Sequence, residues 1–89
     1  QVILRTPDVD RVGRKISLKW KYEVTGVTHY QVYRAKEEEP LKLYTTIAGT
    51  SQSFEDKQVQ MNSTYRYRVI ALFSSGAKSE FSGEVVVKY

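Results

Sequence analysis

The chain has 89 residues, a formal net charge of +4 and no cysteine. A chain of this length supports a single domain, residues 1–89, with one core. The lack of cysteine excludes a disulfide framework, a thiolate metal site and a cysteine nucleophile. Stability must therefore come from packed aromatic side chains and backbone hydrogen bonds.

The positive charge is not arranged as a nucleic-acid site. Lys15, Lys19 and Lys21 point outward from one predicted strand, and Arg66 and Arg68 point outward from another. In a sandwich whose two sheets each hold one of these strands, the basic rows lie on opposite outer surfaces. We therefore expect no nucleic-acid partner. No apolar run has the length of a membrane span, so we expect no membrane insertion either.

The N-terminal half contains three predicted strands. Residues 1–8 form an edge strand or a linker, since Pro7 cannot donate to a strand ladder. Residues 15–22 alternate with Ile16, Leu18 and Trp20 on one face. After the turn at residues 25–27, a third strand has Tyr30 and Val32 inward and Gln31, Tyr33 and Ala35 outward. Residues 35–39 favour helix, but Pro40 stops it after one turn, so we expect a solvated acidic loop.

The C-terminal half holds the strongest strand signal, in residues 62–73. Tyr65, Tyr67, Val69 and Ala71 form one apolar row of this strand. Shorter strands are predicted at residues 41–48, 53–55 and 83–89, with a hairpin turn at residues 74–76. About seven short strands without a helix predict an all-β antiparallel sandwich. The predicted core consists of Trp20, Tyr30, Val32, Phe54, Val59, Tyr65, Tyr67 and Val69.

The spacing of several segments resembles a fibronectin type III domain. These are Trp20, the stretch from Gly26 to Arg34, the Phe54-Glu55-Asp56 turn, the stretch from Thr64 to Ala71, and Gly76 with Ser79 and Ser82. The resemblance implies a seven-stranded immunoglobulin-like sandwich. It also implies that Tyr65 makes the tyrosine corner of the family, bonding its hydroxyl to upstream backbone. Met61 stands where a proline is common in the family. The Tyr-x-Val-Tyr-Arg motif at residues 30–34 is more similar to the motifs of modules in bacterial secreted enzymes than to those of animal matrix proteins.

The titratable residues do not form a catalytic set. His29 is the only histidine, so neither a serine triad nor a histidine metal cluster can be built. Asp8 and Asp10 share a face, but calcium takes six to eight oxygen ligands. We expect no enzyme activity, no cofactor and no metal.

One surface is a candidate contact site. Tyr33, Arg68, Ile70 and Leu72 are predicted to lie together on the outer face of one sheet. Apolar residues with tyrosine and arginine are typical of contact surfaces. Alternatively, Leu41 and Leu43, or an adjoining domain, cover Ile70 and Leu72.

We therefore expect a non-catalytic spacer and interaction module of a larger extracellular or periplasmic protein, monomeric when isolated. The resemblance suggests a bacterial carbohydrate-active enzyme as the parent. Its partners would be neighbouring domains of the same chain, with another protein as a further option. Two alternatives stay open. One is a recognition domain of a receptor or adhesin that uses the face around Tyr33 and Arg68, and the other is carbohydrate binding through exposed tyrosines, namely Tyr22, Tyr33, Tyr44 and Tyr89.

Overall fold

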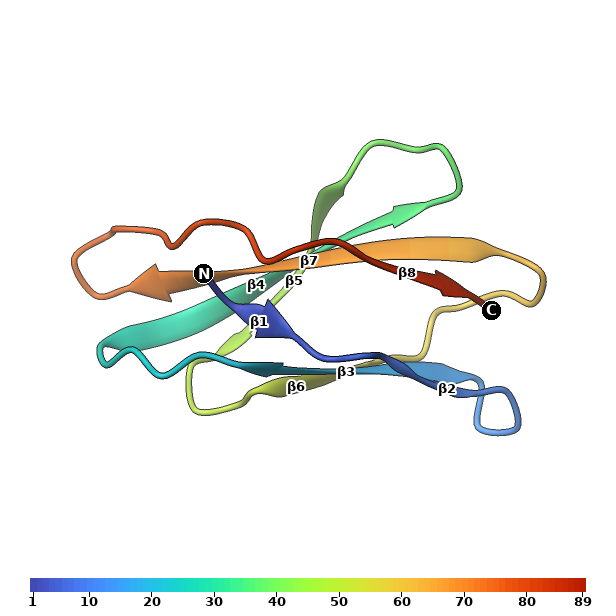
Figure 1. Ribbon diagram of the computed structural model, residues 1–89, viewed down its shortest axis with the longest axis horizontal. Helices are drawn as coiled ribbons and strands as arrows, with labels where there is room; N and C mark the ends of the chain where they lie inside the picture. Colours follow the sequence, from blue (N-terminus) through green and yellow to red (C-terminus); the bar gives the residue numbers. More distant parts are fainter.

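The computed structural model describes all residues from 1 to 89 and contains strands and connecting loops but no helix (Figure 1). The strands are β1 (Ile3–Leu4), β2 (Asp8–Asp10), β3 (Lys15–Lys21), β4 (Val27–Lys36), β5 (Lys42–Ala48), β6 (Ser53–Asp56), β7 (Thr64–Phe73) and β8 (Val85–Lys88). They form two antiparallel sheets packed face to face in a body of 40 × 24 × 17 Å. The all-β prediction is correct.

The first sheet is built around β3. Its Ile16 and Ser17 pair with β2 and also with β6, so these two strands lie on opposite edges of β3. β1 pairs farther along, with Trp20 and Lys21. The other edge of Trp20 is occupied, because its N–H donates to Gln52. β1 and β2 are therefore two halves of one edge strand, interrupted at Pro7, which has no N–H to donate.

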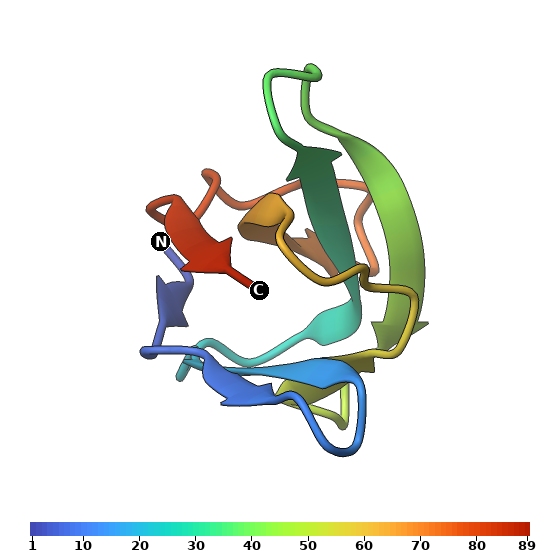
Figure 2. The ribbon, with the colours of Figure 1, turned by 90° about the vertical axis from the view of Figure 1, so that its right-hand side faces the viewer.

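The second sheet has the order β5-β4-β7-β8. Its longest pairing joins β4 to β7, with Val32 opposite Val69 and Tyr33 opposite Arg68. β7 lies inside this sheet, which explains why Ile70 and Ala71 are both buried although they point to opposite faces. In Figure 2, β5 bends toward β6 and closes one side of the sandwich, while β1 and β8 face each other on the other side.

The core lies between the sheets. Six of the predicted core residues are buried, namely Trp20, Tyr30, Val32, Tyr65, Tyr67 and Val69, while Phe54 and Val59 are partly buried and pack against the cluster. Trp20 lies edge-on to Tyr30, with ring centroids 5.3 Å apart. The alternation of apolar residues was thus sufficient to predict which face of each main strand is buried.

Three sequence expectations need correction. The structure has eight strands rather than seven, because the first edge strand is divided into β1 and β2. β8 begins at Val85 rather than at Gly83, since residues 77–83 follow β7 through individual bonds without a regular ladder. Tyr89 is buried rather than exposed, because its ring packs into the core cluster.

At the other terminus Val2 is fully buried and β1 pairs with β3, so residues 1–4 belong to the sandwich.

Candidate functional site

The predicted contact face on the second sheet is largely covered by the chain itself. Tyr33 and Arg68 are cross-strand neighbours, as expected from the alternation of β4 and β7. The ring of Tyr33 contacts Phe81 edge-on, at 5.0 Å between centroids and 81° between planes. Phe81 belongs to the segment bonded to the far edge of β7, so its side chain reaches Tyr33 only by crossing the outer surface of β7. Ile70 lies on that surface and is only 6% exposed.

Ile70 is therefore not available to a partner, which corrects the expectation of an exposed apolar patch. Leu43, one of the residues considered as its cover, is itself about half exposed. Leu72 remains partly exposed, opposite His29 in the ladder. What is left of the predicted surface is the pair of Tyr33 with Phe81, a residue that is 40% exposed, beside Leu72.

The charged part of this face is paired internally. Glu84 accepts a hydrogen bond from Arg66 at 3.2 Å, and Arg68 Nε lies 3.9 Å from the same carboxylate oxygen. Arg66 also donates to the carbonyl groups of Glu37 and Glu39, which holds the acidic loop against β7. The predicted acidic loop is exposed at residues 37–40, as expected, and these bonds anchor its backbone to β7. These contacts leave a face with little free charge.

A second cluster, centred on Asp56, joins the two sheets. Asp56 is the last residue of β6 and is fully buried. Its carboxylate accepts hydrogen bonds from Arg34 at 2.7 Å, from the hydroxyl of Tyr67 at 2.6 Å and from the hydroxyl of Tyr44 at 3.0 Å. The backbone N–H of Gln58 donates to it as well, at 3.0 Å. Three strands of the second sheet thus meet one carboxylate of the first.

The electrostatics of this Asp56 cluster favour fixed protonation states. Burial, followed by the hydrogen bond to Asp56, raises the pKa of Tyr67 well above its ordinary value. Burial and the charge of Asp56 raise the pKa of Tyr44 too. Burial alone would lower the pKa of Arg34, but the hydrogen bond and charge of Asp56 outweigh it and raise that pKa. Both phenols therefore stay protonated donors and Arg34 stays charged, so the cluster acts as a structural clamp.

Tyr65 reinforces the same region. Its hydroxyl accepts a hydrogen bond of 2.7 Å from the backbone N–H of Gln60, which is the upstream bond that the resemblance implies for this position. The guanidinium of Arg34 lies 5.0 Å from the centre of the Tyr65 ring and 4.2 Å from that of Tyr44. Arg34 is thus held between two aromatic rings as well as by Asp56.

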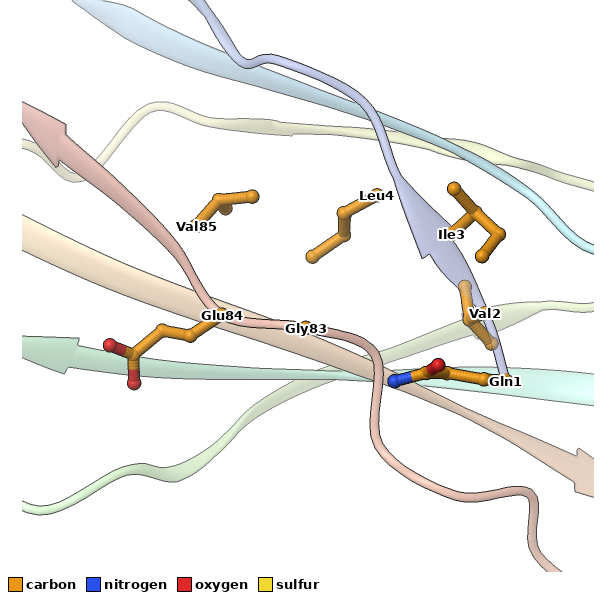
Figure 3. A pocket seen from close by; sticks show the side chains of 7 residues that line it. All are labelled: Gln1, Val2, Ile3, Leu4, Gly83, Glu84 and Val85. Atoms are coloured by element: carbon orange, nitrogen blue, oxygen red, sulfur yellow. The ribbon is translucent and has the colours of Figure 1, made fainter.

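The side of the sandwich opposite β5 has a shallow hollow of about 280 Å³ between β1 and the start of β8. In Figure 3, Leu4 and Val85 extend into the space between the two strands, while Glu84 points away from it. At both ends of this hollow, side chains of the N-terminal segment donate hydrogen bonds to carbonyl groups of the C-terminal segment. Gln1 donates to the carbonyl of Phe81, and Arg11 donates to the carbonyl groups of Lys88 and Tyr89.

Comparisons with known proteins fit this geometry. No family model and no curated protein matches the chain. Among solved structures, a Fn3-like protein from Clostridium thermocellum is 27% identical, with a TM-score of 0.76 over 94% of this chain and 85% of that one. The chain is a fibronectin type III domain. The sixth fibronectin type III domain of human fibronectin type III domain containing protein 3 matches with a TM-score of 0.71 at 25% identity, over 94% of this chain and 80% of that one.

Larger proteins contain the same fold as one part. Pectate lyase PelI from Erwinia chrysanthemi, solved in complex with tetragalacturonic acid, matches with a TM-score of 0.85 at 19% identity. The match covers 98% of this fibronectin type III domain and 28% of the lyase chain. This chain thus spans less than a third of that enzyme, and at this identity the likeness concerns the fold.

Within this fibronectin type III domain, sequence reasoning missed the Asp56 cluster. The sequence pattern indicates only a turn at Asp56 and a motif position for Arg34. A usable signal was present, because Tyr30, Val32 and Arg34 share one phase of β4, and Phe54 and Asp56 share one phase of β6. An arginine and an aspartate that both point into a core are expected to pair there.

No three or more histidine, cysteine, aspartate or glutamate side chains lie close enough together to hold a metal ion. Asp10 instead accepts the N–H of Gly13 at 2.8 Å within the β2–β3 turn. There is also no helix that could cross a membrane.

Proposed function

We propose that this fibronectin type III domain is a non-catalytic spacer of a larger secreted bacterial protein that acts on carbohydrate. The observation that carries the proposal is the placement of the two ends of the chain. They lie on opposite sides of the centre of the 40 Å long axis, with the C-terminus close to one end (Figure 1), so domains joined to them would be offset from each other along that axis. A spacer must also be stiff, and the Asp56 clamp ties the two sheets together.

The comparisons support the kind of parent protein. The part with this fold makes up 28% of the pectate lyase chain, so more than two thirds of that chain lies outside it. By analogy, this domain would sit beside a catalytic domain, in an extracellular or periplasmic location. Its partners would then be its neighbours in the same chain.

The test is a replacement in the parent protein. We expect a flexible Gly/Ser linker of the same residue number, put in place of this domain, to leave turnover of a short soluble oligosaccharide unchanged. The interdomain distance measured by small-angle scattering should become shorter and more widely distributed. Loss of turnover on the short substrate would contradict a spacer, because it would assign this domain a part in the active site.

A recognition role is the second candidate, favoured by the exposed edge of the Tyr33–Phe81 pair beside Leu72. Tyr33→Ser with Phe81→Ser tests it, whereas Ile70→Ser would remove a buried side chain and destabilise the fold. Loss of a partner at unchanged melting temperature would favour recognition. Retention of all partners would favour the spacer.

A further inference from the structure

One end of the sandwich combines exposed apolar side chains with exposed cations. Val12, at the tip of the β2–β3 turn, is 99% exposed, so it has almost no contact with the rest of the protein. Met61, in the loop between β6 and β7, is 58% exposed. The two loops are neighbours, because a hollow of about 340 Å³ is lined by both, including Arg11, Arg14 and Met61. Figure 2 looks onto this end of the molecule.

The cations around these two residues are largely free. Arg14, Lys57 and Lys88 form no ion pair, and all three are exposed. The strand register places Lys57 just beyond the pair of Ile16 with Asp56, which is level with the β2–β3 turn. Lys88 lies at the end of β8 beside Arg11, which donates to its carbonyl.

Nearby carboxylates are fewer than these cations. Asp8 and Asp10 lie in β2, and Glu55 pairs with Lys15 at 3.3 Å, so Arg14, Lys57 and Lys88 together with Arg11 leave an excess of positive charge. The acidic residues 37–39 lie in the β4–β5 loop, which projects from the other sheet, away from the β2–β3 turn in Figure 2. The end that carries Val12 therefore presents apolar tips surrounded by positive charge.

We propose that this end docks peripherally on an anionic lipid surface. A bilayer surface accounts for both features at once, since cations attract acidic headgroups and protruding apolar side chains enter the interface. The β2–β3 turn and the β6–β7 loop project at the same end of the long axis (Figure 1), so one plane can meet both loops together. An acidic protein would explain the cations but would need a recess shaped for Val12. The contact is superficial and needs no membrane-spanning segment.

The first experiment measures co-sedimentation of the 89-residue chain with vesicles of phosphatidylcholine containing about one third phosphatidylglycerol, and with phosphatidylcholine alone. We expect binding only to the anionic vesicles, weakened by salt. Arg14→Ala with Lys57→Ala should weaken it by about fivefold for each cation removed, or roughly 25-fold together. Val12→Asp should weaken it by roughly tenfold or more.

Matched controls lie at the other end of the sandwich. Val24, in the connection between β3 and β4, is 49% exposed, and Lys78, next to the end of β7, is also exposed and unpaired. Val24→Asp and Lys78→Ala should leave vesicle binding unchanged. Because all of the substituted side chains are exposed, all variants should melt like the parent chain.

A second measurement reports whether the side chain at position 12 enters the lipid interface. Val12→Trp should show blue-shifted fluorescence on anionic vesicles, and Val24→Trp should not, against the constant signal of the buried Trp20. The proposal is overturned by absence of vesicle binding, by equal losses in the control variants, or by binding that depends on the cations but not on Val12. Binding to soluble polyglutamate without binding to vesicles would also overturn it, and would identify an acidic polypeptide as the partner.

Discussion

The hydroxyl of Tyr67 donates a 2.6 Å hydrogen bond to the buried carboxylate of Asp56, across the space between the two sheets. This bond shows how the sandwich is held together at the end of β6. A buried carboxylate is costly unless its hydrogen-bonding capacity is filled, and here Arg34 supplies the compensating charge. The clamp therefore depends on all of its members being present.

Removing the carboxylate should be strongly destabilising. Asp56→Ala leaves the largely buried guanidinium of Arg34 without its counter-charge, which costs about 3–5 kcal/mol. For a domain of this size, the melting temperature should fall by at least about 12 °C. Glu55→Ala is the neighbouring control, because its pair with Lys15 is exposed and should contribute less than about 1 kcal/mol. Similar melting of the two variants would show that Asp56 is no clamp.

The free energy of unfolding should also decrease at alkaline pH, because the pKa of Tyr67 is raised in the folded protein. Its folded-state pKa is raised above the ordinary value of about 10, so the folded protein holds the phenol proton more tightly than the unfolded chain does. The resulting stabilisation is fully present below about pH 10 and is lost as the pH rises through the folded-state pKa. Denaturant titrations at increasing pH should show the free energy of unfolding decreasing above this point. Tyr67→Phe should reduce the slope, and an unchanged slope would assign the alkaline loss to other groups.

The hydrogen bond of the tyrosine corner can be tested by removing the hydroxyl oxygen of Tyr65. Tyr65→Phe removes the acceptor of the Gln60 N–H and should cost about 1–2 kcal/mol, measured by chemical denaturation. Tyr33→Phe is a fair control, since the Tyr33 hydroxyl has no hydrogen-bond partner within the protein and the ring can still contact Phe81. Equal stability of the two variants would argue against a role for the corner.

Trp20 should be the main aromatic anchor of the first sheet. Trp20→Ala should cost about 3–5 kcal/mol, because it removes a buried side chain that packs on Tyr30. The native protein should show blue-shifted tryptophan emission with little quenching by acrylamide. Strong quenching before unfolding would contradict the burial of this residue.

The alternation of apolar residues determined the strands, the buried face of β3, β4 and β7, and the class of fold. That pattern is local, since successive side chains of a strand point to opposite faces whatever lies beside it. Tyr65, Val69 and Trp20 could thus be placed in the core from sequence alone.

Only the tertiary structure decided which polar and exposed groups meet. The partner of Asp56 lies 22 residues away in Arg34, and the ring that contacts Tyr33 comes from Phe81, on a segment whose path along β7 no periodicity specifies. Likewise, the exposure of Val12 depends on a turn that projects beyond both sheets. Strand phase indicates that Arg34 and Asp56 both point inward, but which side chains meet across sheets and loops is set by the packing of distant segments.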